Sequence, residues 1–298
     1  MSSQAETISA AAAGTVELGG EKTVNRLGYG AMRITGPGIW GPPKDRKAAI
    51  AVLRRAVELG VNFIDTADSY GPGVSEELIA EALHPYPKDL IIATKGGWNR
   101  PAPGHWSHDS SPKHLREALE GSLKRLRLER IELYQLHTPD PAISFEASME
   151  ALATLQREGK INMIGLSNVT REHIERARRI ANIVSVQNRY SVFDREWEHV
   201  LEYCEQNRIV FIPWFPLGAG GVGHDILSRI AQAHHAKPIQ IACAWLLQRS
   251  PAMLPIPGTS SLQHLEENIA AAAIHLSNEE FRELDQVQGK TTAGRVRG

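Results

Sequence analysis

The chain has 298 residues, of which 42% are hydrophobic and 22% charged, as in an ordinary globular protein and unlike a fibre or a disordered chain. Its 33 basic and 34 acidic side chains nearly balance, which argues against nucleic acid or an anionic membrane as a partner and favours a small molecule. The two cysteines, Cys204 and Cys243, form no CxxC pair. They are expected to be packed thiols in a reducing compartment.

Residues 1–14 are rich in serine and alanine and lack the basic and apolar segments of a signal peptide, so they are predicted to be a flexible N-terminus. No apolar run approaches a membrane span, and the protein is expected to be cytoplasmic. Residues 15–18 and 23–27 flank Gly19 and predict a β-hairpin that plugs one end of the core. Because α/β barrels fill this length, residues 15–298 are predicted to form one domain.

From residue 27 onward, buried strand patterns alternate with helical patterns. Strands are expected at 27–32, 61–65, 90–94, 131–136, 163–166, 183–187, 210–214 and 253–256. Helices are expected near 45–59, 75–83, 112–126, 144–158, 171–181, 196–207, 239–248 and 264–272. This alternation predicts parallel strands with right-handed crossovers, closed into a (β/α)8 TIM barrel. Extra helices near 225–234 and 278–287 and a loose tail at 289–298 lie outside the repeat.

Four polar side chains follow three neighbouring predicted strands. Asp65 and Tyr70 follow the second strand, Lys95 the third and His137 the fourth. The carboxyl ends of barrel strands are where such enzymes carry out chemistry, so the four are expected to meet. A lysine ammonium would favour the phenolate of Tyr70 and make it a better acid, Asp65 would hold that lysine, and His137 would bind the substrate oxygen or relay a proton. Each residue alone is more often solvated or packed; their convergence favours catalysis.

The later strand ends have the groups that a nicotinamide dinucleotide needs. Ser167, Asn168 and Gln187 offer hydroxyl and amide groups for a carboxamide, and Trp214 offers a flat face on which a planar ring can stack. Backbone N–H groups near Gly218 and in the segment 258–260, before a helix, suit phosphates.

Aromatic residues gather in the predicted loops at the barrel mouth. Those expected to line a substrate pocket are Trp40, Trp98, Trp106 and Tyr190. His105 and His108 lie beside them and are interpreted as exposed loop residues, because their spacing fits no metal motif. No metal site is predicted.

These motifs resemble the aldo-keto reductase superfamily from Leu27 to Asn268. The matching segments are DTADSYG (65–71), TK (94–95), QLH (135–137), GLSN (165–168), PGTSS (257–261) and HLEEN (264–268). The resemblance implies that Tyr70 is the general acid, that Asp65 and Lys95 tune it and that His137 orients the carbonyl. The cofactor site is then expected to comprise Gly30, Ala31, Met32, Asp65, Ser167, Asn168, Gln187, Trp214, Phe215, Pro216, Leu217, Gly218, Gly258, Thr259, Ser260, His264, Glu267 and Asn268.

One departure concerns the cofactor's 2′-phosphate. Many members of the superfamily grip it with a lysine and an arginine, where this chain has Gly258 and His264. Thr259, Ser260 and His264 offer other partners, and the loop has no obvious acidic reader of a free ribose 2′-hydroxyl. NADPH is therefore the expected cofactor, with NADH as the alternative.

The expected function is reduction of an aldehyde or ketone by hydride from the nicotinamide and a proton from Tyr70. Two alternatives stand beside it. The chain could be a regulatory subunit that binds the cofactor and senses redox state without turnover. Alternatively, Lys95 could form a Schiff base in a lyase.

Overall fold

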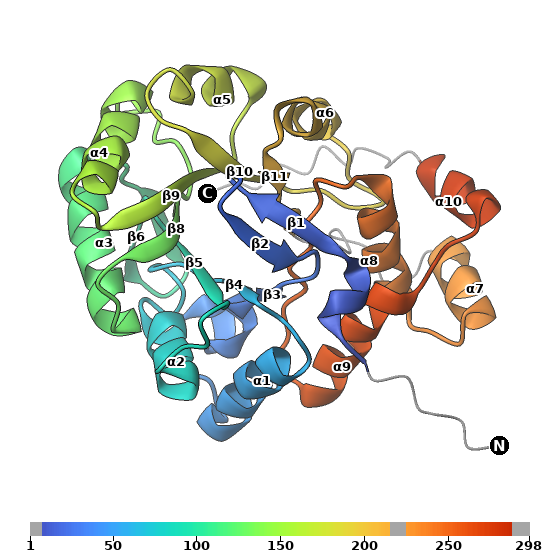
Figure 1. Cartoon of the computed structure of the whole chain (residues 1–298). Helices are drawn as coiled ribbons and strands as arrows, with labels where there is room; N and C mark the ends of the chain where they lie inside the picture. The colour runs from blue at the N-terminus through green and yellow to red at the C-terminus, as the bar shows by residue number, and fades with distance from the viewer. Residues whose placement is uncertain (1–7, 215–224, 288–298) are drawn as a thin grey trace.

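A curved parallel sheet surrounded by helices forms the centre of the computed structural model, which describes residues 8–214 and 225–287 (Figure 1). The strands follow the order β3 (Tyr29–Gly30), β4 (Phe63–Asp65), β5 (Ile91–Gly96), β8 (Ile131–Leu136), β9 (Ile161–Ser167), β10 (Ile183–Gln187) and β11 (Val210–Phe211). All neighbouring pairs are parallel. Their carboxyl ends therefore lie at one end of the sheet.

An extended segment at residues 252–256 closes the barrel. On one side, Leu254 N donates to Phe211 O at 2.9 Å; on the other, Gly28 N donates to Pro255 O at 2.9 Å. The eighth strand predicted here is present only as this bridging segment, with one isolated β-bridge to β11. The predicted (β/α)8 barrel is confirmed.

The N-terminal hairpin covers the amino-terminal end of the barrel. It consists of the antiparallel strands β1 (Thr15–Leu18) and β2 (Lys22–Asn25), drawn in blue in Figure 1. Leu18 and Val24 are buried in the same apolar cluster as Phe63 and the other inward side chains of the strands. At the turn, Gly19 has φ +61°, and a Cβ there would lie 2.8 Å from Val184 Cγ1. The hairpin is therefore pressed against the barrel floor, as predicted.

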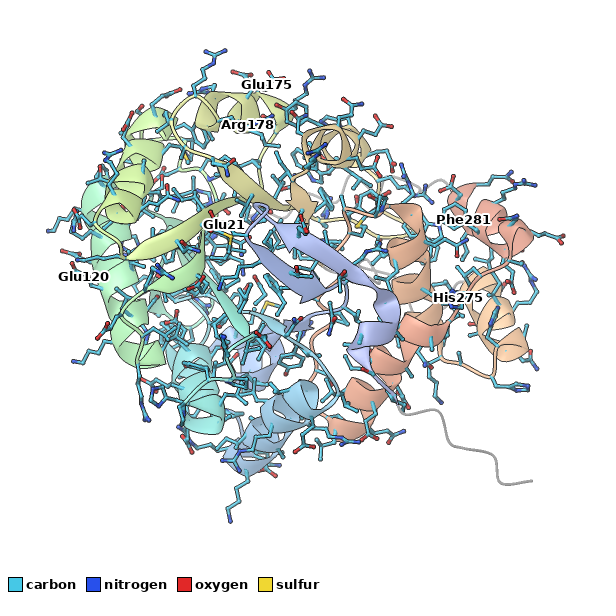
Figure 2. The ribbon with its side chains drawn as sticks, viewed as in Figure 1. Glu21, Glu120, Glu175, Arg178, His275 and Phe281 are labelled. Atoms are coloured by element: carbon cyan, nitrogen blue, oxygen red, sulfur yellow. The ribbon has the colours of Figure 1, made fainter. Side chains whose placement is uncertain are left out.

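The helices pack around the sheet through a second apolar layer and turn charged faces outward, as Glu120 and Glu175 show (Figure 2). The barrel helices are α1 (Arg46–Glu58), α2 (Val74–Leu83), α3 (Pro112–Leu126), α4 (Phe145–Arg157), α5 (Arg171–Ala177), α6 (Glu198–Asn207), α8 (Pro238–Arg249) and α9 (Leu262–Ala270). Two more, α7 (Asp225–Ala233) and α10 (Asn278–Asp285), are the predicted additions. Cys204 and Cys243 are free and buried. In the described ranges, no helix is long and apolar enough to cross a bilayer.

Other features also differ from the sequence-based expectations. Residues 1–14 were expected to be flexible, but Ala10–Ala13 form a 3-10 helix whose Ala10 N donates to Leu59 O at 2.8 Å. The loop after β5 contains an antiparallel hairpin, β6 (Trp98–Ala102) and β7 (His105–His108). This hairpin was not predicted from the sequence because proline, present at position 101, usually interrupts a strand pattern. The tail at 289–298 lies outside the described residues.

Candidate active site

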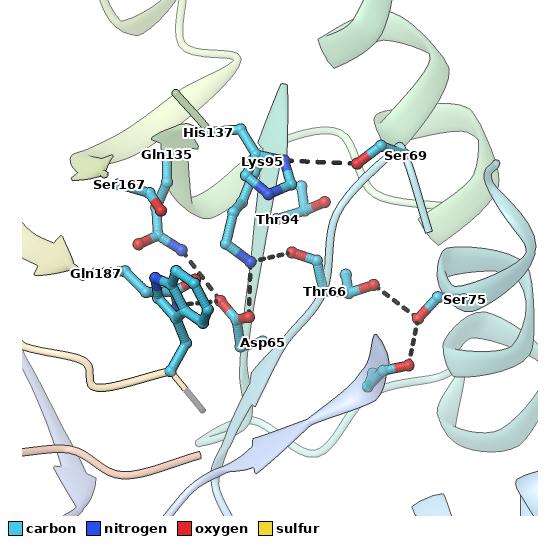
Figure 3. A network of polar contacts seen from close by, with 12 residues as sticks. Asp65, Thr66, Ser69, Ser75, Thr94, Lys95, Gln135, His137, Ser167 and Gln187 are labelled. Carbon is cyan, nitrogen blue, oxygen red and sulfur yellow. Dashed lines mark hydrogen bonds and ion pairs between the residues drawn. The ribbon is translucent and has the colours of Figure 1, made fainter. Parts of the chain in front are cut away.

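The four predicted catalytic residues lie at the same end of the barrel. Asp65 is the last residue of β4, and Lys95 is the penultimate residue of β5. His137 directly follows β8, where Gln135 pairs with Lys95 in the strand register. Figure 3 shows the side chains of Asp65, Lys95 and His137 gathered at this end.

Asp65 and Lys95 form a buried ion pair. Lys95 Nζ lies 2.6 Å from Asp65 Oδ1 and donates to Thr66 O at 2.8 Å, and the two side chains are only 0% and 3% exposed. Asp65 Oδ2 accepts from the amide nitrogens of Gln135 at 3.1 Å and Gln187 at 2.9 Å. Burial alone would lower the pKa of Lys95, but the Asp65 carboxylate and Tyr70 outweigh it and raise that pKa above its usual value. Lys95 is therefore an ammonium held in one place.

Tyr70 is buried beside this ion pair. Lys95 Nζ lies 5.2 Å from the centroid of the Tyr70 ring. Burial raises the pKa of Tyr70, and the Lys95 charge opposes that rise without cancelling it. Lys95 thus lowers the pKa of Tyr70, as expected, but the increase in that pKa caused by desolvation is larger. The phenol is protonated at neutral pH, which is the state that a proton donor needs.

His137 completes the group. Its ring meets the Tyr70 ring edge-on, with centroids 5.9 Å apart, and its Nδ1 lies 3.4 Å from Ser69 Oγ. Burial, followed by the charges of Lys95 and His108, lowers the pKa of His137 well below 6.5. The imidazole is therefore neutral at pH 7, with one N–H donor and one acceptor nitrogen.

The lowered pKa of His137 predicts acid sensitivity. In the unfolded chain this histidine binds a proton near pH 6.5, but in the fold it does so only at lower pH, so its contribution to stability is complete above pH 6.5 and declines below it. We expect His137→Gln to lose less unfolding free energy than the parent between pH 7 and pH 5 in urea titrations. Equal slopes in parent and His137→Gln would contradict the prediction.

The predicted carboxamide-binding groups lie along the next strand ends. Asn168, with φ +56°, donates through its amide to His137 O at 3.0 Å and Thr138 Oγ1 at 3.1 Å, and its Oδ1 accepts from Trp214 Nε1 at 3.2 Å. The Asn168 side-chain amide therefore already has hydrogen-bond partners, one of which is the indole N–H of Trp214. The Ser167 hydroxyl and the Gln187 amide oxygen are the groups of this set better suited to an incoming carboxamide.

The segment after residue 256 meets the first strand. A Cβ on Gly258 would lie 2.5 Å from Gly30 O, and Tyr29 Oη donates to Thr259 O at 2.5 Å. Ser261 then caps α9 by accepting from His264 N. Backbone N–H groups at a helix N-terminus suit anions. Of the other predicted cofactor residues, Ala31, Met32, Ser260, Glu267 and Asn268 are among the described residues, whereas Phe215, Pro216, Leu217 and Gly218 lie outside them.

Aromatic side chains from the β6–β7 hairpin line the mouth. The Trp98 ring lies edge-on to those of Trp106 and His137, with centroids 5.6 and 6.2 Å away, and its Nε1 donates to Thr138 Oγ1 at 3.2 Å. Tyr190 is different and corrects the pocket prediction. It is fully buried, stacks on Trp245 with centroids 6.0 Å apart and donates its hydroxyl to Glu198 at 2.6 Å.

Comparison with known proteins shows to which family the chain belongs. Residues 26–288 match the family model described as Aldo/keto reductase family. The chain belongs to the aldo/keto reductase family. It is 50% identical over 286 residues to an uncharacterised oxidoreductase of Schizosaccharomyces pombe, covering 95% of this chain and 92% of the relative. It is 46% identical over 276 residues to pyridoxine 4-dehydrogenase of Escherichia coli, covering 90% of this chain and 96% of the relative.

Solved aldo/keto reductase structures share the fold. A thermostable aldo-keto reductase in complex with the inhibitor epalrestat superposes with a TM-score of 0.80 at 34% identity, covering 92% of this chain and 99% of the other. An aldo-keto reductase of Klebsiella pneumoniae in complex with NADPH superposes with a TM-score of 0.78 at 28% identity, covering 92% and 95%. The protein is thus an oxidoreductase whose homologues bind NADP(H).

Two residues of this aldo/keto reductase site, Gln135 and Ser69, were not predicted from the sequence. Gln135 donates to the same Asp65 oxygen as the predicted Gln187, and Ser69 faces His137. A polar residue within the apolar strand 131–136 was the available signal for Gln135. Ser69 carried no signal, because serine is common in loops for local reasons. In the described part of the chain, no cluster of three His, Cys, Asp or Glu side chains is arranged to hold a metal.

Proposed function

We propose that this aldo/keto reductase reduces an aldehyde or ketone to an alcohol with NADPH, using Tyr70 as the proton donor. The carrying observation is the buried Lys95–Asp65 ion pair beside a buried, protonated Tyr70. An ammonium fixed near a phenol stabilises the phenolate that remains after the proton has left. The arrangement therefore suits protonation of an oxygen on which negative charge develops.

Each of the four residues then has a distinct role. His137, neutral and next to Tyr70, donates its N–H to the substrate carbonyl oxygen and orients it. Tyr70 transfers its proton to that oxygen as the alcohol forms, and Lys95 stabilises the resulting tyrosinate. Asp65 keeps Lys95 in place and protonated. The nicotinamide cofactor, when bound, supplies the hydride that reduces the carbonyl carbon.

The chain's residues fit such a cofactor. The Trp214 indole is held by Asn168, so that its face can stack on the nicotinamide, while Ser167 and the Gln187 amide oxygen hydrogen-bond the carboxamide. The N-terminus of α9 and Thr259 offer donors to phosphate. No carboxylate occurs in residues 257–264 to repel a 2′-phosphate, which favours NADPH over NADH.

The first substrate to test is the pyridoxal–pyridoxine pair. The Escherichia coli relative is named a pyridoxine 4-dehydrogenase, and the reverse of an alcohol dehydrogenation is the reduction of a carbonyl. The rings of Trp98, Trp106 and His108 pack against one another at the mouth, with the Trp98 and His108 centroids 4.1 Å apart, and form an aromatic wall against which a planar heteroaromatic ring can pack.

The deciding experiment has two steps. The protein is first titrated with NADPH and NADH by tryptophan fluorescence, and carbonyl compounds including pyridoxal are then screened with the tighter cofactor. We expect tighter binding of NADPH and substrate-dependent loss of its absorbance. Tight binding without oxidation of NADPH by any carbonyl would favour a regulatory binding protein. The Schiff-base alternative is opposed by the protonation of Lys95, because an ammonium is not a nucleophile.

Trp214→Ala should weaken cofactor binding while leaving the fold intact. Stacking of an aromatic pair contributes about 0.5–1.5 kcal/mol beyond area burial, so the loss in NADPH affinity should be on the order of tenfold. Fluorescence of the remaining tryptophans or calorimetry measures it. Trp106→Ala is the control, because Trp106 belongs to the mouth hairpin. Equal NADPH affinity in parent and Trp214→Ala would remove Trp214 from the cofactor site.

A further inference from the structure

Arg100 is a buried cation that the catalytic scheme does not use. It lies in β6 of the mouth hairpin and is only 7% exposed. Burial lowers its pKa, and no charged group of the described chain contributes to that shift. Among the described residues, Arg100 forms no ion pair with a carboxylate. A buried guanidinium without a counter-ion is costly, so some other interaction must keep it there.

Backbone carbonyls from two mouth loops hold the guanidinium. Arg100 Nη1 donates to Ile39 O and to Ser69 O, both at 3.2 Å, and Nη2 donates to Gly38 O at 3.3 Å. The Ser69 carbonyl directly precedes Tyr70 in the chain, and the Ser69 hydroxyl faces His137. One side chain thus joins the loop at 36–41 to the turn that carries the proton donor.

The loop at 36–41 has a conformation that needs support. Gly38 and Ile39 are both left-handed, with φ of +67° and +58°. A β-branched residue in this region is a genuine outlier and costs on the order of 1–3 kcal/mol. The carbonyls of both residues accept from Arg100, and Gly71 N also donates to Ile39 O at 3.2 Å. Arg100 therefore stabilises a strained loop in contact with the Tyr70 turn.

Two tryptophan rings lie over the same guanidinium. Arg100 Cζ lies 3.5 Å from the ring centroid of Trp106 and 5.4 Å from that of Trp40. Trp106 comes from β7, while Trp40 forms a β-bridge with Gly71. Arginine stacks on aromatic faces while its N–H groups stay free to donate in the ring plane. The mouth hairpin, the 36–41 loop and the Tyr70 turn therefore converge on one side chain.

We propose that Arg100 is a positioning residue that fixes these three segments and so holds Tyr70 in its proton-donating place. This rests on the proposed role of Tyr70. Arg100 itself touches neither the reacting oxygen nor the cofactor in this scheme. Its loss should release the strain at Ile39, let the 69–71 turn move and misplace the phenol.

The test compares Arg100→Met and Arg100→Lys with the control Arg130→Met, which removes an exposed arginine paired only with Glu132 among the described residues. In Arg100→Met, kcat/KM for carbonyl reduction should fall on the order of 10²-fold, as a displacement near 1 Å does elsewhere, with NADPH affinity unchanged. Amide exchange should quicken at Gly41 and Gly71, whose N–H groups bind Gly71 O and Ile39 O. Arg100→Lys should recover part of the rate, since it keeps the charge without the planar stack.

Chemical rescue tests the role even if a variant is unstable. Arg100→Ala removes the guanidinium that lies beside Trp40 and Trp106, so dilute guanidinium should raise the kcat of this variant, whereas urea at the same concentration should not. Parent-like kcat/KM in Arg100→Met, or lost activity with unchanged exchange at Gly41 and Gly71, would overturn the proposal. So would the absence of guanidinium rescue. If Tyr70→Phe itself keeps full activity, the proposed function fails instead, whatever Arg100 does.

Discussion

Tyr70→Phe should reduce kcat for carbonyl reduction by about 10²- to 10⁴-fold, the usual contribution of a positioned general acid, while NADPH still binds. The substitution removes only the hydroxyl, and the ring keeps its edge contact with His137. Burial raises the pKa of Tyr70, so the parent enzyme keeps this proton throughout the neutral range. Stopped-flow measurement of NADPH oxidation in a single turnover tests the step directly, and fluorescence titration tests cofactor binding.

Tyr134→Phe is the matched control. Tyr134 is likewise buried, on β8, but its hydroxyl has no hydrogen-bond partner among the described residues. Removing a buried hydroxyl without a partner should be neutral or stabilising, and activity should remain. If Tyr70→Phe turned over at the parental rate, Tyr70 could not be the proton donor.

Strand ends in the first half of the barrel could be located from the sequence with little error. Apolar segments at 61–65, 90–94 and 131–136 become β4, β5 and β8 with boundaries within two residues. A parallel barrel places all their carboxyl ends at one rim, so polar residues there are neighbours wherever they lie in the chain. This topological rule is why Asp65, Lys95 and His137 could be grouped from the sequence.

Side-chain direction after a strand end is not determined by such a rule. Tyr190 lies in a loop beyond β10, as predicted, yet its ring points into the apolar layer against Trp245. Arg100 shows the opposite case. From the sequence alone, an arginine in a loop is expected to be solvated, but the β6–β7 hairpin places Arg100 against residues 38 and 39. Both outcomes depend on tertiary contacts between segments far apart in sequence, which local patterns do not contain.

Asn168 shows a related limit. Its position after β9 suggested an amide free for the cofactor, but the left-handed backbone turns that amide toward His137 O and Thr138. Asparagine adopts this conformation more readily than other residues. The residue therefore acts on the site through Trp214, whose indole nitrogen it holds.

Lys95→Met should abolish turnover and also destabilise the fold, unlike Tyr70→Phe. In the described part of the chain, it leaves the buried Asp65 side chain with only the Gln135 and Gln187 amides as partners. Removing one member of a buried ion pair costs about 3–5 kcal/mol, because the remaining charge is uncompensated. Urea denaturation measures that loss, and kcat falls because no cation remains to stabilise the Tyr70 phenolate.

The double variant Asp65→Asn/Lys95→Met separates the two effects. With both charges removed, no uncompensated charge is buried, so most of the unfolding free energy lost in Lys95→Met should return. Activity should not return, because the double variant still lacks the ammonium beside Tyr70. Recovery of stability together with turnover would mean that the charge of Lys95 is dispensable for proton transfer. If neither stability nor turnover recovered, Lys95 would contribute through the packing of its side chain at the barrel mouth and not through its charge. Only regained stability without regained activity fits an ion pair retained for catalysis.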